Sequence, residues 1–177
     1  MTTTVSRRRV CALMMVLMAV AAIVSASAAA GTPAPNVEMR TAKGPRVRLS
    51  DFRGKVVVME IWASWCPNCK VSFPAADRLY REFKDKGVEV IAVNVDEQRK
   101  DAEAFLKAHP HTLRVMFDPR AKIPEAFGTH GMPTSYIIDP RGMIRYTHEG
   151  YDTSPDAAYR REIMTLLPEW NESSNRN

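Results

Sequence analysis

Two predominantly apolar runs, at residues 55–63 (KVVVMEIWA) and 88–95 (VEVIAVNV), constrain the fold of this chain more than any other feature. Their length and their content of β-branched residues predict buried strands. Between the two runs, from residue 67 to about residue 86, apolar residues recur at helical spacing, and Gly87 ends that stretch. Pro74 lies inside the predicted helix and should kink it. The chain therefore predicts a strand–helix–strand unit at its core.

The segments around this unit complete one domain. Residues 32–35 read as a flexible lead-in. A small hairpin is predicted at residues 36–50, a helix at 96–108 and a short strand at 114–118. A short helix follows at residues 123–128, an antiparallel pair at 134–150 and a capped final helix at 154–170. This order predicts an α/β fold with a mixed central β-sheet, helices on both faces and an extra N-terminal β-hairpin. The domain spans residues 36–170, and residues 171–177 form a polar tail.

Residues 1–30 predict an export signal. A basic head at residues 7–9, an uncharged stretch at residues 10–24 and the small residues Ala26-Ser27-Ala28 are the three parts of a secretory signal. An uncleaved membrane anchor is the alternative, because the apolar stretch continues to Ala30 and a span needs ~20 residues. In both cases the rest of the chain is exported, to the periplasm or cell envelope. Its formal charge falls from +5 to about +2, and no basic stripe in the sequence indicates a nucleic-acid partner.

Export leaves two cysteines, Cys66 and Cys69, in an oxidising compartment. A purely structural disulfide is a poor explanation, because closing so short a loop stabilises little. A structural zinc site needs about four ligands, and the only close histidines, His109 and His111, lie far downstream. At the start of the predicted helix, free backbone N–H groups and the helix dipole favour a thiolate. We therefore expect Cys66 to attack a disulfide and Cys69 to resolve the mixed disulfide.

The segment WASWCPNCKVSFP, followed by Gly131-Met132-Pro133-Thr134, resembles the thioredoxin superfamily. In detail the chain is similar to exported, TlpA-like thiol–disulfide reductases, which include the cytochrome c maturation reductants, over residues 36–170. The resemblance implies a thioredoxin-like fold and a monomer whose only redox group is the Cys66–Cys69 disulfide. It also implies disulfide-containing clients, such as apocytochrome c or copper-site assembly proteins, and a membrane thiol-electron carrier as reductant.

The resemblance also assigns individual residues. Pro133 matches the cis-proline that faces the disulfide, and Met132 would offer its backbone to an extended substrate strand. Trp65 and Pro67 flank Cys66 and are expected to line the substrate groove. The same scaffold at a higher redox potential would be an exported oxidase or isomerase. A copper or zinc chaperone that uses the CxxC pair as ligands is the alternative from another class.

Glu60 is the polar residue that interrupts the first apolar run. Burial of a carboxylate is costly and raises its pKa, which would suit Glu60 to exchange a proton with Cys69. The structural alternative is a carboxylate that finds a lysine or water at the end of the sheet. Thioredoxins carry a buried carboxylate at this position, whereas TlpA-like reductases often carry a glutamate three residues after the second cysteine. Here that position is Ser72, so either Glu60 acts as the only acid or the redox potential of the pair differs from that of the related reductases.

Overall fold

The computed structural model describes residues 31–41, 44–150 and 155–167. The predicted export signal, the predicted N-cap Ser154 and the polar tail lie outside these residues. Among the residues described, no helix is both long enough and apolar enough to cross a bilayer. Thr32–Asn177 forms a compact unit of its own. The complete sheet and both hydrophobic clusters lie within it, as an independently folding domain requires.

A six-stranded mixed sheet has the order β1-β8-β7-β4-β5-β6, and β2 and β3 form a separate hairpin. β4, β5 and β6 are parallel, whereas β7, β8 and β1 continue the sheet in antiparallel pairs. The strands are β1 (Thr32–Pro33), β2 (Glu38–Arg40), β3 (Arg46–Arg48), β4 (Val56–Trp62), β5 (Val88–Asn94), β6 (Arg114–Phe117), β7 (Thr134–Ile138) and β8 (Met143–Glu149). The helices are η2 (Leu49–Phe52), α2 (Cys69–Phe83), η3 (Lys84–Lys86), α3 (Arg99–Ala108), α4 (Lys122–Phe127) and α5 (Pro155–Leu166).

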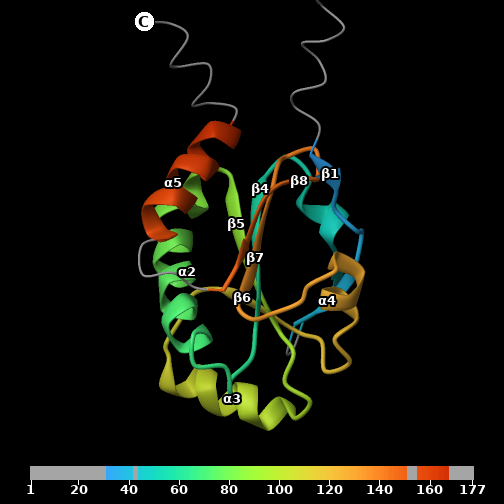
Figure 1. Ribbon diagram of the computed structural model, residues 1–177, viewed down its shortest axis with the longest axis vertical. Helices are drawn as coiled ribbons and strands as arrows, with labels where there is room; N and C mark the ends of the chain where they lie inside the picture. Colours follow the sequence, from blue (N-terminus) through green and yellow to red (C-terminus); the bar gives the residue numbers. More distant parts are fainter. Residues whose placement is uncertain (1–30, 42–43, 151–154, 168–177) are drawn as a thin grey trace, which may run out of the picture. The chain divides into compact units, whose positions relative to one another are not determined.

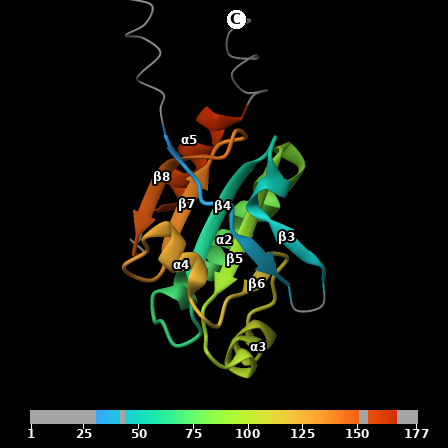
Figure 2. The ribbon, with the colours of Figure 1, turned by 90° about the vertical axis from the view of Figure 1, so that its right-hand side faces the viewer.

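Figure 1, which views the sheet nearly edge-on, shows α2 and α5 on one face of the sheet and α4 on the other. Figure 2 shows α4 and the β2–β3 hairpin in front of the sheet. The predicted fold, with a mixed sheet between helices and an extra hairpin, is confirmed. One detail of the prediction is wrong: Thr32–Pro33 is not a loose lead-in, because it pairs with Met143 and Ile144 of β8.

Alternate side chains of β4 enter two hydrophobic clusters, because successive residues of a strand point to opposite faces. Val58 and Trp62 pack under α2, α3 and α5, whereas Met59 and Ile61 pack under the hairpin, η2 and α4. All seven residues of β4 are buried, which explains their near-continuous apolar sequence. Glu60 lies on the α2 side of this strand, and it is therefore buried directly beneath the helix that carries Cys69.

Candidate active site

The two cysteines lie where β4 gives way to α2. Cys66 is in the turn before the helix, and α2 begins at Cys69. The helix predicted from residue 67 therefore begins two residues later than expected. Lys70 donates its N–H to the Pro67 carbonyl at 3.2 Å, in the i to i−3 pattern of a 3₁₀ turn. This tighter turn precedes the α-helix, as is common at helix N-termini.

Cys66 Sγ nevertheless receives a backbone N–H from the helix. The amide of Cys69 donates to Cys66 Sγ at 3.3 Å, and the Cys66 thiol donates to the Met132 carbonyl at 3.5 Å. Both cysteines are free thiols in this structure. An N–H group that already points at the sulfur stabilises negative charge when the thiol ionises. The geometry suits Cys66 to be the attacking sulfur.

The groove around Cys66 contains three of the four residues that the sequence predicted for substrate contact, and the fourth, Pro133, lines the cavity beside Glu60. Trp65, Pro67 and Met132 line an open hollow beside Cys66, together with Asn68 and Gly131. The Met132–Pro133 peptide bond is cis. Trp65 is 65% exposed, which is unusual for a large aromatic side chain. Such a side chain beside a reactive sulfur offers apolar surface to an incoming polypeptide.

A carboxylate clamp holds the loop that leads to Cys66. Asp96, which follows β5, accepts the Ser64 N–H through both of its oxygens, at 3.1 and 3.2 Å. Asn94 donates its side-chain amide to the same carboxylate at 3.0 Å. Trp62 packs against Phe73 with a ring-centroid distance of 4.8 Å. Trp62 is fully buried and belongs to the same hydrophobic cluster as Cys66 and Cys69.

Cys69 is the resolving cysteine by its environment. Its side chain is fully buried, and burial raises the pKa of its thiol far above the usual value. The nearby Cys66 and the negative charge of Glu60 raise that pKa further. Cys69 therefore stays protonated until a base removes its proton.

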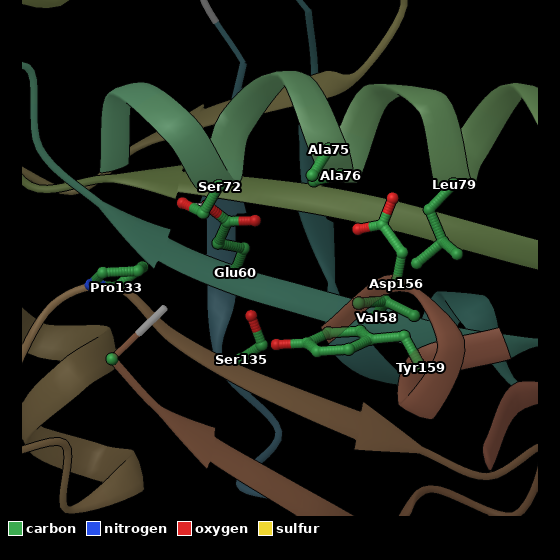
Figure 3. Close-up of a pocket in the computed structure, with 11 residues that line it drawn as sticks. Val58, Glu60, Ser72, Ala75, Ala76, Leu79, Pro133, Ser135, Asp156 and Tyr159 are labelled. Atoms are coloured by element: carbon green, nitrogen blue, oxygen red, sulfur yellow. Dashed lines mark hydrogen bonds between the residues drawn. The ribbon is translucent and has the colours of Figure 1, made fainter. Parts of the chain in front are cut away.

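Glu60 is the residue best suited to act as the base for Cys69. It is 3% exposed, and burial raises its pKa to about 7. The Ser72 hydroxyl donates to Glu60 Oε1 at 2.6 Å, which lowers the pKa and so offsets part of the effect of burial. Figure 3 shows the two side chains facing each other beneath α2. Ser72 is not a second acid, but it binds Glu60 directly as a hydrogen-bond donor.

A water-sized cavity adjoins the Glu60–Ser72 pair. Its walls include Pro133 and Ser135 as well as Asp156 and Tyr159 of α5 (Figure 3). The cavity volume is about 20 Å³, and a single water needs about 10 to 15 Å³ and polar partners. Glu60, Ser72 and Ser135 provide such partners, so a water fits beside the carboxylate. Glu60 can therefore exchange protons at this point while remaining buried.

Sequence reasoning missed two residues of the site, Ser72 and Asp96. Ser72 was noted only as a departure from the related sequences, and its position one turn after Cys69 was the available signal for a contact with the strand below. Asp96 follows a buried strand at the end of the sheet that carries Cys66, which is where site residues of α/β proteins gather. Within the described part of the chain, no cluster of three or more His, Cys, Asp or Glu side chains could hold a metal ion.

A dithiol at the start of a helix, opposite a cis-proline and on a thioredoxin-like sheet, defines a thiol–disulfide exchange protein. Residues 29–163 match the Redoxin family, and the chain belongs to that family.

Two relatives named thiol-disulfide oxidoreductase ResA agree with this assignment. The protein from Bacillus subtilis (strain 168) is 35% identical over 114 residues, which are 64% of each chain. The protein from Geobacillus kaustophilus (strain HTA426) is 32% identical over 140 residues, which are 79% of each chain.

Solved structures agree as well. A crystal structure of a candidate thiol:disulfide interchange protein DsbE from Chlorobium tepidum is 38% identical, with a TM-score of 0.74. The match covers 78% of this chain and 97% of that one. These relatives confirm the prediction of a thiol–disulfide oxidoreductase with a thioredoxin-like fold.

Proposed function

We propose that this protein is exported and reduces disulfides in client proteins of the cell envelope, with Cys66 as nucleophile and Cys69 as resolving thiol. The observation that carries the proposal is the asymmetry of the two sulfurs. Cys66 is 4% exposed, lines an open groove and accepts the Cys69 N–H at 3.3 Å, whereas Cys69 is 0% exposed and burial raises its pKa. Such a pair attacks with one sulfur and resolves with the other.

The exchange proceeds in two balanced steps. The Cys66 thiolate attacks one sulfur of the client disulfide, and the other client sulfur leaves as a thiolate that takes up a proton. Glu60 then accepts the proton of Cys69, directly or through one water in the adjoining cavity. The Cys69 thiolate attacks Cys66 Sγ, and the second client thiolate leaves and is protonated. The client gains two electrons and two protons, and Cys66–Cys69 is left oxidised.

The groove supports a polypeptide substrate. An extended client strand that pairs with the backbone at Met132 would bring its disulfide to Cys66, because the Met132 carbonyl lies 3.5 Å from Cys66 Sγ. Trp65 and Pro67 would then contact the client side chains on the same side of the groove. Apocytochrome c and copper-site assembly proteins are the proposed clients, and a membrane thiol-electron carrier is the proposed reductant that restores the two thiols.

Trapping of clients tests this proposal. In Cys69→Ser the first attack proceeds but resolution cannot, so Cys66 should accumulate mixed disulfides with envelope proteins. Cys66→Ser is the matched control and should trap none. Purified mixed disulfides are identified by mass spectrometry after non-reducing electrophoresis. If Cys69→Ser traps no more protein than the control does, the client-reducing role is wrong.

The direction of electron flow has a separate test. The equilibrium of Cys66–Cys69 with glutathione gives its reduction potential, and CxxC proteins range from about −270 to about −120 mV. A potential toward the lower end of this range supports a reductant. A potential close to the upper end would identify an oxidase and overturn the proposed direction.

A further inference from the structure

Four separate segments meet at the end of the sheet where β4 begins. The Gly54 N–H donates to the Pro140 carbonyl at 2.9 Å, and the Val56 N–H donates to the Gly87 carbonyl at 3.0 Å. The Ala34 N–H donates to the Gly142 carbonyl at 2.9 Å. These hydrogen bonds join the turn before β4, the segment after η3, the β7–β8 turn and the chain just after β1. Far-apart parts of the sequence thus form one surface.

This surface, which we call the basic end, gathers positive charge. The exposed basic residues that lie in or beside the four joined segments are Arg53, Lys55, Lys84, Lys86 and Arg141. The guanidinium of Arg53 lies directly over Gly142, so the turn before β4 and the β7–β8 turn present their charges side by side. The exposed acidic residues in or beside these same segments, among those described, are Asp51 and Asp85.

Buried carboxylates below the basic end do not neutralise it. Glu89 contacts Lys55 at 3.5 Å but is also bound by Arg114 at 2.7 Å. Asp139 contacts Arg141 at 3.4 Å but is also bound by Arg145 at 3.3 Å. With these partners included, seven basic residues against four acidic ones leave a formal charge of +3.

The exported chain as a whole has a formal charge of only about +2, because three of the 25 basic residues of the full sequence lie in the predicted signal. The remainder of the domain is therefore net negative. Nearby ion pairs on the helices, such as Arg160 with Glu82 at 2.8 Å, are balanced. The positive charge is concentrated at one end of the sheet. The basic residues that supply it do not form a continuous run in the sequence.

We propose that the basic end binds the surface of a bilayer that contains anionic phospholipid. A cluster of basic side chains gains about 1 kcal/mol per charge near such a surface, which is about a fivefold change in affinity. The chain also enters the domain here, because β1 is joined to the β7–β8 turn. The apolar residues 10–24, which are predicted to belong to an export signal or a membrane anchor, end only a few residues before β1.

Binding in this orientation positions the redox site. β4 starts at the basic end and runs toward Cys66, and its seven residues at about 3.3 Å each span about 20 Å. Figure 1 shows β1 near the upper end of the sheet and the start of α2 toward the lower end. The groove beside Cys66 would therefore face away from the lipid, where exported clients are accessible. This consequence rests on the proposed function, whereas the binding itself does not.

Vesicle binding tests the proposal. The protein from Thr32 onward is mixed with phosphatidylcholine vesicles, with or without phosphatidylglycerol, and bound protein is measured by sedimentation. Use of this fragment removes any contribution of the apolar residues 10–24. Wild type should bind only vesicles that contain phosphatidylglycerol, and added salt should release it. Removal of three charges, in Lys84→Gln/Lys86→Gln/Arg141→Gln, should weaken binding about 100-fold.

A charge-matched control separates a specific surface from general attraction. Lys100→Gln/Lys107→Gln/Arg120→Gln removes the same charge from exposed residues of α3 and of the turn after β6, and it should bind like wild type. Insulin disulfide reduction measured on all three proteins reports folding and redox activity independently of lipid. Equal weakening in both triple variants, or no binding of active wild type to anionic vesicles, overturns the proposal. If only client reduction falls in the first variant, the basic end binds proteins instead.

Discussion

Replacement of Ser72 by alanine should shift the pH dependence of the second exchange step. A hydrogen bond to a charged group is worth about 1.5 to 3 kcal/mol and one to a neutral group about 0.5 to 1.5 kcal/mol. The 2.6 Å bond from Ser72 therefore favours ionised Glu60 by about 1 to 1.5 kcal/mol over the neutral acid, which is about one pKa unit. In Ser72→Ala the pKa of Glu60 should rise from about 7 to about 8.

The rate effect follows from the fraction of ionised Glu60. Near pH 7 that fraction falls from about one half to about one tenth, so resolution by Cys69 should slow about fivefold. Reaction with the chromogenic disulfide of Ellman's reagent separates the two steps. Attack by Cys66 releases the first thionitrobenzoate, and attack by Cys69 on the mixed disulfide releases the second. The slow phase should shift to higher pH, and the fast phase should not change.

Two variants control for simple disruption of the cavity. Ser135→Ala removes another buried hydroxyl from the same cavity wall, and it should leave the midpoint near pH 7. Ser72→Thr keeps a hydroxyl at position 72 and should restore the wild-type profile. A slow-phase midpoint in Ser72→Ala that equals or lies below that of wild type would refute the role of this hydrogen bond. Equal slowing of both phases would refute it as well.

Three further variants test the energetics by denaturant unfolding. Glu60→Gln removes a carboxyl group whose pKa is raised from 4.5 to about 7, so wild type loses stability as pH rises through that range. The variant does not lose this stability, and relative to wild type it should be stabilised by about 3 kcal/mol near pH 8 but not near pH 4. Asp139→Ala should cost about 2 kcal/mol near neutrality, because Asp139 is buried yet accepts the Met143 N–H and binds Arg145, which holds its pKa below the usual 3.8. That cost should shrink only as pH falls below about 4, where Asp139 becomes protonated in wild type. Phe73→Ala should cost about 3 to 5 kcal/mol at every pH, because Phe73 is fully buried against Trp62 and Phe105. A pH-independent effect of Glu60→Gln, a neutral Asp139→Ala or a stable Phe73→Ala would contradict the respective packing and charge assignments.

The fold could be predicted because its main signals are local. The apolar run of β4, the helical spacing in α2 and Gly87 between α2 and β5 each depend on neighbours along the chain. Gly87 adopts a φ of +83°, which explains why a glycine ends this segment. The family resemblance also predicted from the sequence that Cys66, Met132 and Pro133 lie close together.

What could not be predicted depends on contacts between distant segments. The pairing of β1 with β8 joins residues more than one hundred positions apart, and the two-residue strand has no periodicity to detect. The two-residue displacement of the start of α2 arises from a local 3₁₀ turn, and helix boundaries are the least certain part of any sequence-based prediction. The basic end escapes detection for the same reason, because its charges come from four segments.

The contact between Glu60 and Ser72 joins an acid on the central strand to a hydroxyl donor on the helix that carries Cys69. Position 60 lies on β4 and position 72 on α2, and their oxygens are 2.6 Å apart in the buried layer between strand and helix. This chain therefore carries the carboxylate on the strand and a hydroxyl donor at the facing position of the helix. Burial raises the pKa of the carboxyl group and the Ser72 hydroxyl lowers it, so this hydroxyl helps to keep Glu60 near neutrality, where it can both accept and return a proton.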